Sequence, residues 1–108
     1  MAEIVLFHHA GGLTVGVHAF AESLREAGHA VETPDLFGGR TFGDVAEGVA
    51  FAQAAGEDSF AQAAAALDFP DGVVYAGMSM GCARAAEQVL FRRGARGAFF
   101  LYGAVDPA

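Results

Sequence analysis

The chain has 108 residues, the length of one domain with a modest core. Hydrophobic residues make up 54% and charged residues 18%, a composition that excludes an intrinsically disordered chain. Thirteen acidic and six basic residues give a net charge of −7, which argues against nucleic acid or an anionic membrane as a partner. The single cysteine excludes an internal disulfide. With no signal-peptide pattern and no apolar run near the roughly 20 residues that span a bilayer, we predict a cytoplasmic protein.

The first elements expected along the chain are a strand, a loop and a helix. Residues 4–7 are a continuous apolar run of strand length, which is typical of a strand covered on both faces in a parallel sheet. A loop with two glycines follows over 8–13. It leads into a helix with apolar residues at helical spacing, which Thr14 caps and Gly28 ends. A shorter strand is expected over 30–33.

The rest of the chain continues the alternation of strands and helices. The expected elements are a turn over 34–40, a helix from Asp44 to Ala55 opened by a capping box with Glu47, a helix capped by Asp58 that runs to Leu67, a strand from 73, a helix over 83–93 ended by Gly94, and a strand over 97–102. This alternation predicts an α/β fold: a parallel sheet of four strands in the order second, first, third, fourth, with helices on both faces. Functional loops then gather at the carboxyl ends of the strands.

The pentapeptide Gly-Met-Ser-Met-Gly, which ends the third strand and precedes a helix, is the strongest motif in the chain. A G-x-S-x-G turn in this context holds its serine in a strained conformation, and Gly77 and Gly81 lack the Cβ atoms that would collide there. We therefore predict Ser79 as a nucleophile. The backbone N–H of Met80 is predicted to stabilise an oxyanion. A glycine-rich packing turn without chemistry is the alternative.

The loop after the first strand is predicted to supply the second oxyanion amide, from Ala10. Gly11 and Gly12 behind it provide backbone freedom. A phosphate-binding loop is a competing interpretation, although neither G-x-G-x-x-G nor Walker spacing is present. No cofactor is expected. Cys82, inside the helix after the serine, is predicted to be a small buried core residue.

A general base for the serine is harder to find. His18 and His29 fall on or after the first helix and are predicted to be solvated surface residues. His8 and His9 lie on the correct rim, but neighbours in an extended backbone point to opposite sides, so one of them at most can face the crevice. We favour a pocket-lining role for His9 over direct proton transfer, and no metal site, since no third ligand is evident.

Three charged residues follow the second and fourth strands. Asp106 is a candidate to orient a histidine, but Asp106 and Asp35 both sit where aspartates commonly cap turns. Arg40 is a candidate to bind a substrate carboxylate as a bidentate fork, or is a solvated loop charge.

Four segments in this order, VLFHHAGGL, AGHAVETPDLFGGRTF, VVYAGMSMG and ARGAFFLYGAV, resemble the dienelactone hydrolase family of α/β-hydrolases over nearly the whole chain. The resemblance implies that Ser79 is the nucleophile, that Ala10 and Met80 are the oxyanion amides, and that Arg40 lies near the site of an anionic substrate. Dienelactone hydrolases carry a cysteine nucleophile, so the serine is similar to that of related serine esterases. His9 stands where those enzymes have a glutamate.

The resemblance also implies a longer protein, because residues 1–108 match only the amino-terminal part of one α/β-hydrolase domain, before the segments that supply the acid and the histidine. We predict a serine hydrolase that acts on a small ester, lactone or thioester through an acyl-enzyme on Ser79, with an incomplete triad. One further hypothesis is an intact small hydrolase that uses His9 as base. The alternative from another class is a non-catalytic half-domain that self-associates or binds a partner through the open edge at Phe99, Phe100 and Leu101.

Overall fold

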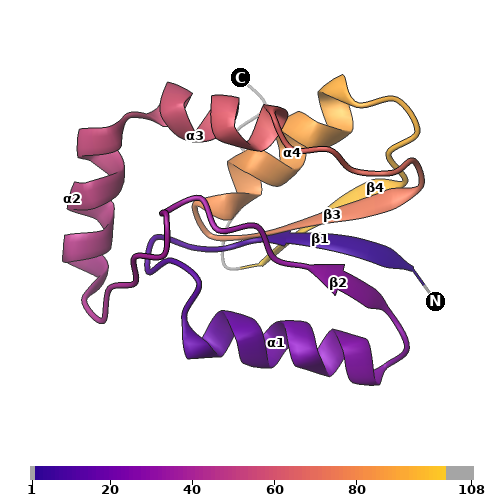
Figure 1. Ribbon diagram of the computed structural model, residues 1–108, viewed down its shortest axis with the longest axis horizontal. Coiled ribbons are helices and arrows are strands. Elements are labelled where there is room, and N and C mark those ends of the chain that lie inside the picture. The colour runs from indigo at the N-terminus through magenta and orange to yellow at the C-terminus, as the bar shows by residue number, and fades with distance from the viewer. Residues whose placement is uncertain (1, 102–108) are drawn as a thin grey trace.

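The computed structural model describes residues 2–101, in which strands and helices alternate as expected (Figure 1). The strands are β1 (Glu3–Phe7), β2 (Ala30–Glu32), β3 (Val73–Met78) and β4 (Gly97–Leu101). The helices are α1 (Val15–Glu26), α2 (Val45–Ala55), α3 (Glu57–Ala65) and α4 (Gly81–Phe91). The four strands form one sheet in the order β2-β1-β3-β4, and every neighbouring pair is parallel. The predicted α/β class and strand order are therefore confirmed.

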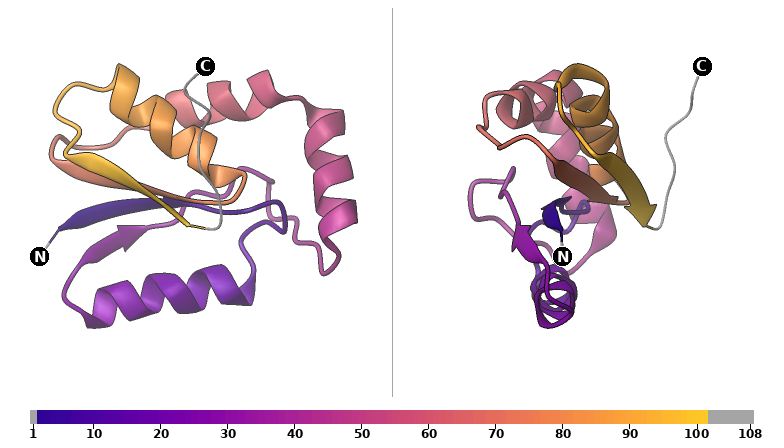
Figure 2. Two further views of the ribbon diagram at one scale, coloured as in Figure 1. Left: turned by 180° about the vertical axis from the view of Figure 1, so that it is seen from behind. Right: turned by 90° about the vertical axis from the view of Figure 1, so that its right-hand side faces the viewer.

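Helices cover both faces of the sheet. Helix α1 lies on one face, α3 and α4 lie on the other, and α2 stands across the carboxyl end of the strands (Figures 1 and 2). The alternation along β1 explains this arrangement: Ile4 and Leu6 pack with α1, whereas Val5 and Phe7 pack with α3 and α4. Full burial of such side chains stabilises the fold by about 2 kcal/mol each. A strand buried on both faces is what its unbroken apolar sequence predicts.

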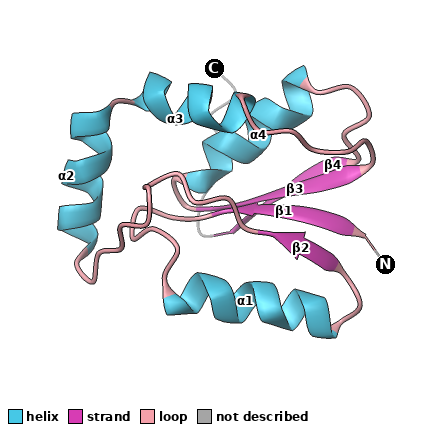
Figure 3. Ribbon diagram, viewed as in Figure 1, coloured by secondary structure: helices cyan, strands magenta, loops and turns pink. Residues whose placement is uncertain are grey.

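Two polar side chains begin helices as the sequence predicts. The Oγ1 of Thr14 accepts the N–H of Val17 at 3.4 Å, and the Oδ1 of Asp44 accepts the N–H of Ala46 at 2.8 Å. Glycines end α1 and α2, because Gly28 and Gly56 have φ of 100° and 89°. Figure 3 shows a short loop from α1 to β2 and a long loop from β2 to α2.

The start of α3 differs from the prediction. Asp58 does not cap this helix: α3 begins at Glu57, and its capping position is Gly56, which has no side chain to offer. The left-handed conformation of Gly56 ends α2 and begins α3 at once, so Asp58 falls in the first helical turn. The helix also ends at Ala65, two residues before the predicted Leu67.

The end of α4 differs as well. The helix stops at Phe91 because Arg92 leaves helical geometry and turns back toward α3. Its guanidinium donates to the carbonyls of Ala64 at 3.1 Å and Leu67 at 2.7 Å, at and just after the end of α3. Gly94, predicted to end the helix, instead lies in the following turn with φ of 79°.

Within residues 2–101, no helix is both long and apolar enough to cross a membrane.

Candidate active site

Ser79 occupies a strained turn between β3 and α4. Its φ is 53°, and it is the one residue other than glycine with positive φ in the part of the chain that the structure describes. Such a conformation costs a non-glycine residue about 1–2 kcal/mol. The backbone on either side fixes it: the N–H of Ser79 donates to the carbonyl of Leu101 at 2.7 Å, and its own carbonyl accepts from Cys82 at 2.9 Å. The side chain is exposed, so its hydroxyl projects from the sheet edge.

The two glycines of the motif are required by close backbone contacts. A Cβ on Gly77 would collide with the carbonyl of Gly81, because the helix doubles back over the strand at this point. A Cβ on Gly81 would collide with the carbonyls of Phe7 and His8 at the end of β1. Any side chain at either position would push α4 away from the sheet and change the turn that presents Ser79.

A pocket of about 530 Å³ opens beside Ser79. It collects the three residues that the sequence predicts for the nucleophile and the oxyanion amides, and α2 and α3 form its other wall. The lining residues are Ala10, Val45, Val49, Ala52, Gln53, Glu57, Ser79 and Met80. The candidate site is therefore assembled from two loops that are far apart in the sequence and from one helix standing across the sheet end.

The backbone N–H groups of the two predicted oxyanion residues make no backbone hydrogen bond within the described part of the chain. Among residues 2–101, the N–H of Ala10 and that of Met80 donate to no backbone carbonyl. Met80 also immediately precedes α4, where the unpaired amides of a helix start carry partial positive charge. Two such donors on the same pocket as a serine hydroxyl are candidates to stabilise a tetrahedral oxyanion.

Contacts from distant segments hold the loop that carries Ala10. The N–H of Phe42 donates to the carbonyl of Gly11 at 2.9 Å, and Gly12 forms an isolated antiparallel bridge with Thr41. A Cβ on Gly48 of α2 would collide with the carbonyl of Ala10. This tight packing fixes the Ala10 peptide against the helix that walls the pocket.

His8 is a buried structural residue. Its Nε2 accepts the N–H of Leu36 at 3.0 Å, and its Nδ1 lies 2.8 Å from the carbonyl of His9. These partners assign the proton to Nδ1 and leave the ring neutral. The ring packs edge-on against Phe37, with centroids 4.7 Å apart. Burial lowers the pKa of His8 below its ordinary value of 6.5. Both ring nitrogens are engaged on the β2 side, so His8 does not serve Ser79.

His9 is also tied to its own loop. Its Nδ1 accepts the N–H of Gly11 at 2.9 Å, which places the proton of the neutral ring on Nε2. The lone pair that a general base would need is thus occupied, and His9 does not line the pocket of Ser79. The geometry favours a loop-ordering role over either predicted role, lining the pocket or transferring the proton.

The other two histidines lie away from the site. His18 is exposed on α1, as predicted. His29 is not a freely solvated residue, since its Nδ1 accepts the N–H of Ala2 at 3.0 Å and so ties the loop before β2 to the start of β1. All four histidines of the chain are therefore described, and none hydrogen-bonds the hydroxyl of Ser79.

The remaining charged candidates do not converge on the pocket. Arg40 is exposed, and its guanidinium lies 5.3 Å from the ring centre of Phe51 rather than on the pocket lining. Asp35 caps a turn, as its sequence context predicts, because its carboxylate accepts the N–H groups of Phe37 and Gly39, both at 2.9 Å. Asp106 lies outside the described residues.

Cys82 is confirmed as a buried core residue. It is 1% exposed, and its Sγ donates to the carbonyl of Gly77 at 3.4 Å. Burial raises the pKa of its thiol above the ordinary value of 9.0, which disfavours the reactive thiolate.

Within residues 2–101, no group of three His, Cys, Asp or Glu side chains is arranged to hold a metal ion.

Sequence reasoning missed Glu57 and the apolar face of α2 that includes Val45 and Val49. The sequence features that could have indicated these residues are weak. Both valines are exposed apolar residues on a helix, and Glu57 directly follows the helix-ending Gly56, but neither feature alone indicates which loop lies opposite.

Fold and site together define a parallel α/β protein with a strained, exposed serine at a strand-to-helix turn. Comparison of the chain with protein-family models, with curated proteins and with solved structures finds no match. The residues and their geometry are therefore the basis for any function assigned to this chain.

Proposed function

We propose that the chain is a serine hydrolase of the α/β-hydrolase type, similar to the dienelactone hydrolases, which acts on a small ester, lactone or thioester. The observation that carries this proposal is the position of Ser79: strained, exposed, and sharing one pocket with the unpaired amides of Ala10 and Met80. A non-glycine residue in the left-handed region is retained where function requires it. A plain packing turn would have no need of the serine.

The reaction would proceed in two acyl transfers. The Oγ of Ser79 forms a bond to the acyl carbon, the bond to the leaving oxygen or sulfur breaks, and the hydroxyl proton passes through a base to the leaving group. The amides of Ala10 and Met80 stabilise the negative charge on the carbonyl oxygen. Water then cleaves the acyl-enzyme and restores the hydroxyl. One lost oxyanion donor costs an enzyme of this type about a hundredfold or more in rate.

The proposed triad is incomplete within the described residues. The imidazoles of His8 and His9 are engaged elsewhere, and no aspartate joins an imidazole to Ser79. Serine is a weak nucleophile until its proton is accepted, so full activity depends on an acid and a base outside residues 2–101. The lone chain is expected to react slowly with activated reagents.

The pocket dimensions support a small substrate. A volume of about 530 Å³ is within the usual range for small-molecule sites, and Val45, Val49 and Ala52 make its α2 wall mainly apolar. A cytoplasmic location and independence of cofactors remain predictions.

Reaction with a fluorophosphonate probe tests the proposal. We expect the probe to modify Ser79, identified by peptide mass spectrometry, and Ser79→Ala to abolish the modification. Ser59→Ala is the matched control, because Ser59 is an exposed serine on α3 in ordinary helical backbone. Modification that survives Ser79→Ala, or no modification at all, would contradict the proposal.

A specific observation favours the second candidate, a non-catalytic module that associates through its sheet edge. Among the described residues, strand β4 pairs only with β3, and Phe100 on this edge is 40% exposed. Unpaired strand edges with apolar side chains readily pair with another chain. Light scattering over a range of concentrations tests this function: a dimer that Phe100→Lys dissociates, in a protein that never reacts at Ser79, would support it.

A further inference from the structure

Glu57 is the one charged residue on the pocket beside Ser79. The rest of the lining is apolar or uncharged, including the whole α2 wall. The side chain of Glu57 is 66% exposed, so its carboxylate is accessible to a bound molecule. Arg40, which the family resemblance places near an anionic substrate, lies over Phe51 instead.

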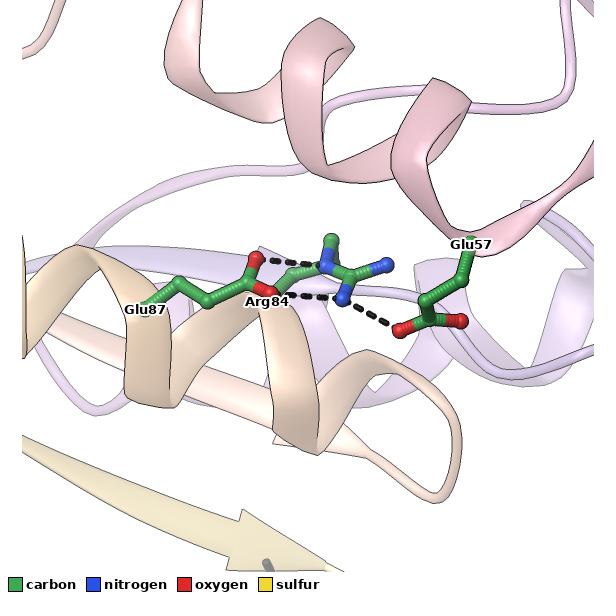
Figure 4. Close-up of polar contacts among 3 residues, drawn as sticks. All are labelled: Glu57, Arg84 and Glu87. Atoms are coloured by element: carbon green, nitrogen blue, oxygen red, sulfur yellow. Dashed lines mark hydrogen bonds and ion pairs between the residues drawn. The ribbon is translucent and has the colours of Figure 1, made fainter.

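A buried arginine on the helix after the serine holds this carboxylate in place. Arg84 of α4 is 1% exposed, and its Nη2 donates to Glu57 at 2.5 Å. The Nε and Nη2 of the same guanidinium also donate to the carboxylate of Glu87, both at 2.7 Å. Figure 4 shows the guanidinium between the two carboxylates, one from α3 and one from α4. Glu57 is thus a positioned charge rather than a free surface side chain.

The charges of this cluster sum to one negative charge. Burial alone would lower the pKa of Arg84, but hydrogen bonds and charge from Glu87 and Glu57 outweigh it and raise the pKa above its ordinary value. Arg84 is therefore fully charged and balances one of the two carboxylates. Its Nη1 has no hydrogen-bond partner among the described residues, but Arg84 is buried and does not line the pocket, so its N–H groups do not reach a molecule bound beside Ser79.

The two carboxylates face different surroundings. Glu87 lines a separate groove of about 470 Å³ between α3 and α4, away from Ser79. Glu57 alone faces the candidate active site. A fixed carboxylate beside the reacting centre attracts positive charge and repels negative charge, and the water that reaches this exposed side chain moderates both effects.

We propose that Glu57, held by Arg84, makes the Ser79 pocket selective for substrates that carry a cationic group, such as an ammonium, and disfavours carboxylate substrates. This inference rests on the proposed function, since it assigns the substrate class of that site. It differs from the anionic substrate that the family resemblance implies. Glu57 acts on specificity, and Arg84 is a positioning residue.

Three p-nitrophenyl esters of similar length test the inference: a neutral butanoate, a 4-trimethylammonio-butanoate and a hemisuccinate with a free carboxylate. The rate of nitrophenolate release gives the acylation rate of each ester, and peptide mass spectrometry confirms that Ser79 carries the acyl group. We expect the cationic ester to acylate about tenfold faster than the neutral one, and the anionic ester slower by a similar factor.

Three variants separate the possible outcomes. Glu57→Gln should bring the acylation rates of the cationic and anionic esters together, so that the ratio between them falls to about one. Asp58→Asn is the matched control, because it removes a negative charge next to Glu57 on α3 from a residue that neither lines the pocket nor pairs with Arg84, and it should keep the preference. Acylation without charge preference, or an equal loss for all esters in Glu57→Gln, overturns the inference and leaves the proposed function intact. No acylation of Ser79 by any ester, with Ser79→Ala as reference, overturns both.

Discussion

The turn after β3 and the loop after β1 meet at one pocket, but they are held by different forces. The turn that carries Ser79 is fixed mainly by excluded volume, at two glycines whose missing Cβ atoms allow α4 to touch β3 and the end of β1. The loop that carries Ala10 is fixed by partners 30 or more residues away, through the bond from Phe42 to Gly11 and the contact with Gly48. One half of the site is thus set by close backbone packing in the core, and the other half by a hydrogen bond and packing against α2 outside the sheet.

This difference determines which half is more robust. Close backbone contacts restrict the Ser79 turn wherever α4 is packed on β3 and on the end of β1. The Ala10 loop relies on hydrogen bonds of modest net energy, about 1 kcal/mol each. We therefore expect the Ser79 turn to resist perturbation until the core fails, and the Ala10 loop to respond to changes in α2.

The largest expected effect comes from Gly81→Ala. The new methyl group would press on the carbonyls of Phe7 and His8 inside the core, so we expect a loss of about 3 kcal/mol in the free energy of unfolding, together with loss of probe reaction at Ser79. Urea unfolding measures the first quantity. Gly43→Ala is the control, because no atom lies within 4 Å of a Cβ at that position. Equal stability of the two variants would contradict a sterically fixed turn.

Gly48→Ala tests how the Ala10 loop is held, because two effects of this substitution predict opposite changes in the free energy of unfolding. Helix propensity alone predicts that alanine stabilises α2 by about 1 kcal/mol. The collision with the carbonyl of Ala10 predicts destabilisation, by about 1–2 kcal/mol, since α2 can shift more easily than the core. We expect destabilisation and slower probe reaction at Ser79. A gain in stability would show that α2 does not pack on the Ala10 loop.

Replacement of the serine itself separates strain from chemistry. Ser79→Ala keeps a side chain at φ of 53°, whereas Ser79→Gly removes the strain. Both variants should lose probe reaction, but we expect Ser79→Gly to be about 1 kcal/mol more stable than Ser79→Ala in thermal or urea unfolding. A less stable glycine variant would indicate an unstrained turn.

The smallest expected effect concerns His8 and pH. Because burial lowers its pKa in the folded state, the unfolded chain binds more protons as pH falls below 6.5. The stability contributed by neutral His8 is therefore complete above pH 6.5 and is lost as pH falls toward the lowered folded pKa. Unfolding measured from pH 8 to 5 should show a shallower dependence in His8→Gln than in the exposed control His18→Gln. Identical profiles would contradict a buried neutral ring.

The sequence predicted the Ser79 half of the site best. The alternation of strands and helices predicted the strand order, and the G-x-S-x-G spacing at a strand-to-helix junction predicted the turn, because close backbone packing there requires glycines. His8 and Glu57 could not. His8 is defined by Leu36 and Phe37 from the turn after β2, and Glu57 by a buried Arg84 on α4. Such contacts join segments that only the tertiary fold brings together, and local patterns in one sequence do not predict them.

The central claim is that the hydroxyl of Ser79, beside the amides of Ala10 and Met80, accepts an acyl group. Its most direct test is the first turnover of p-nitrophenyl acetate, followed by mass spectrometry of the peptide that contains Ser79. We expect a burst of one nitrophenolate per chain, with the acetyl group on Ser79 and slow release, because the described histidines do not reach the hydroxyl. Acetylation of another residue, or a burst that survives Ser79→Ala, would contradict it.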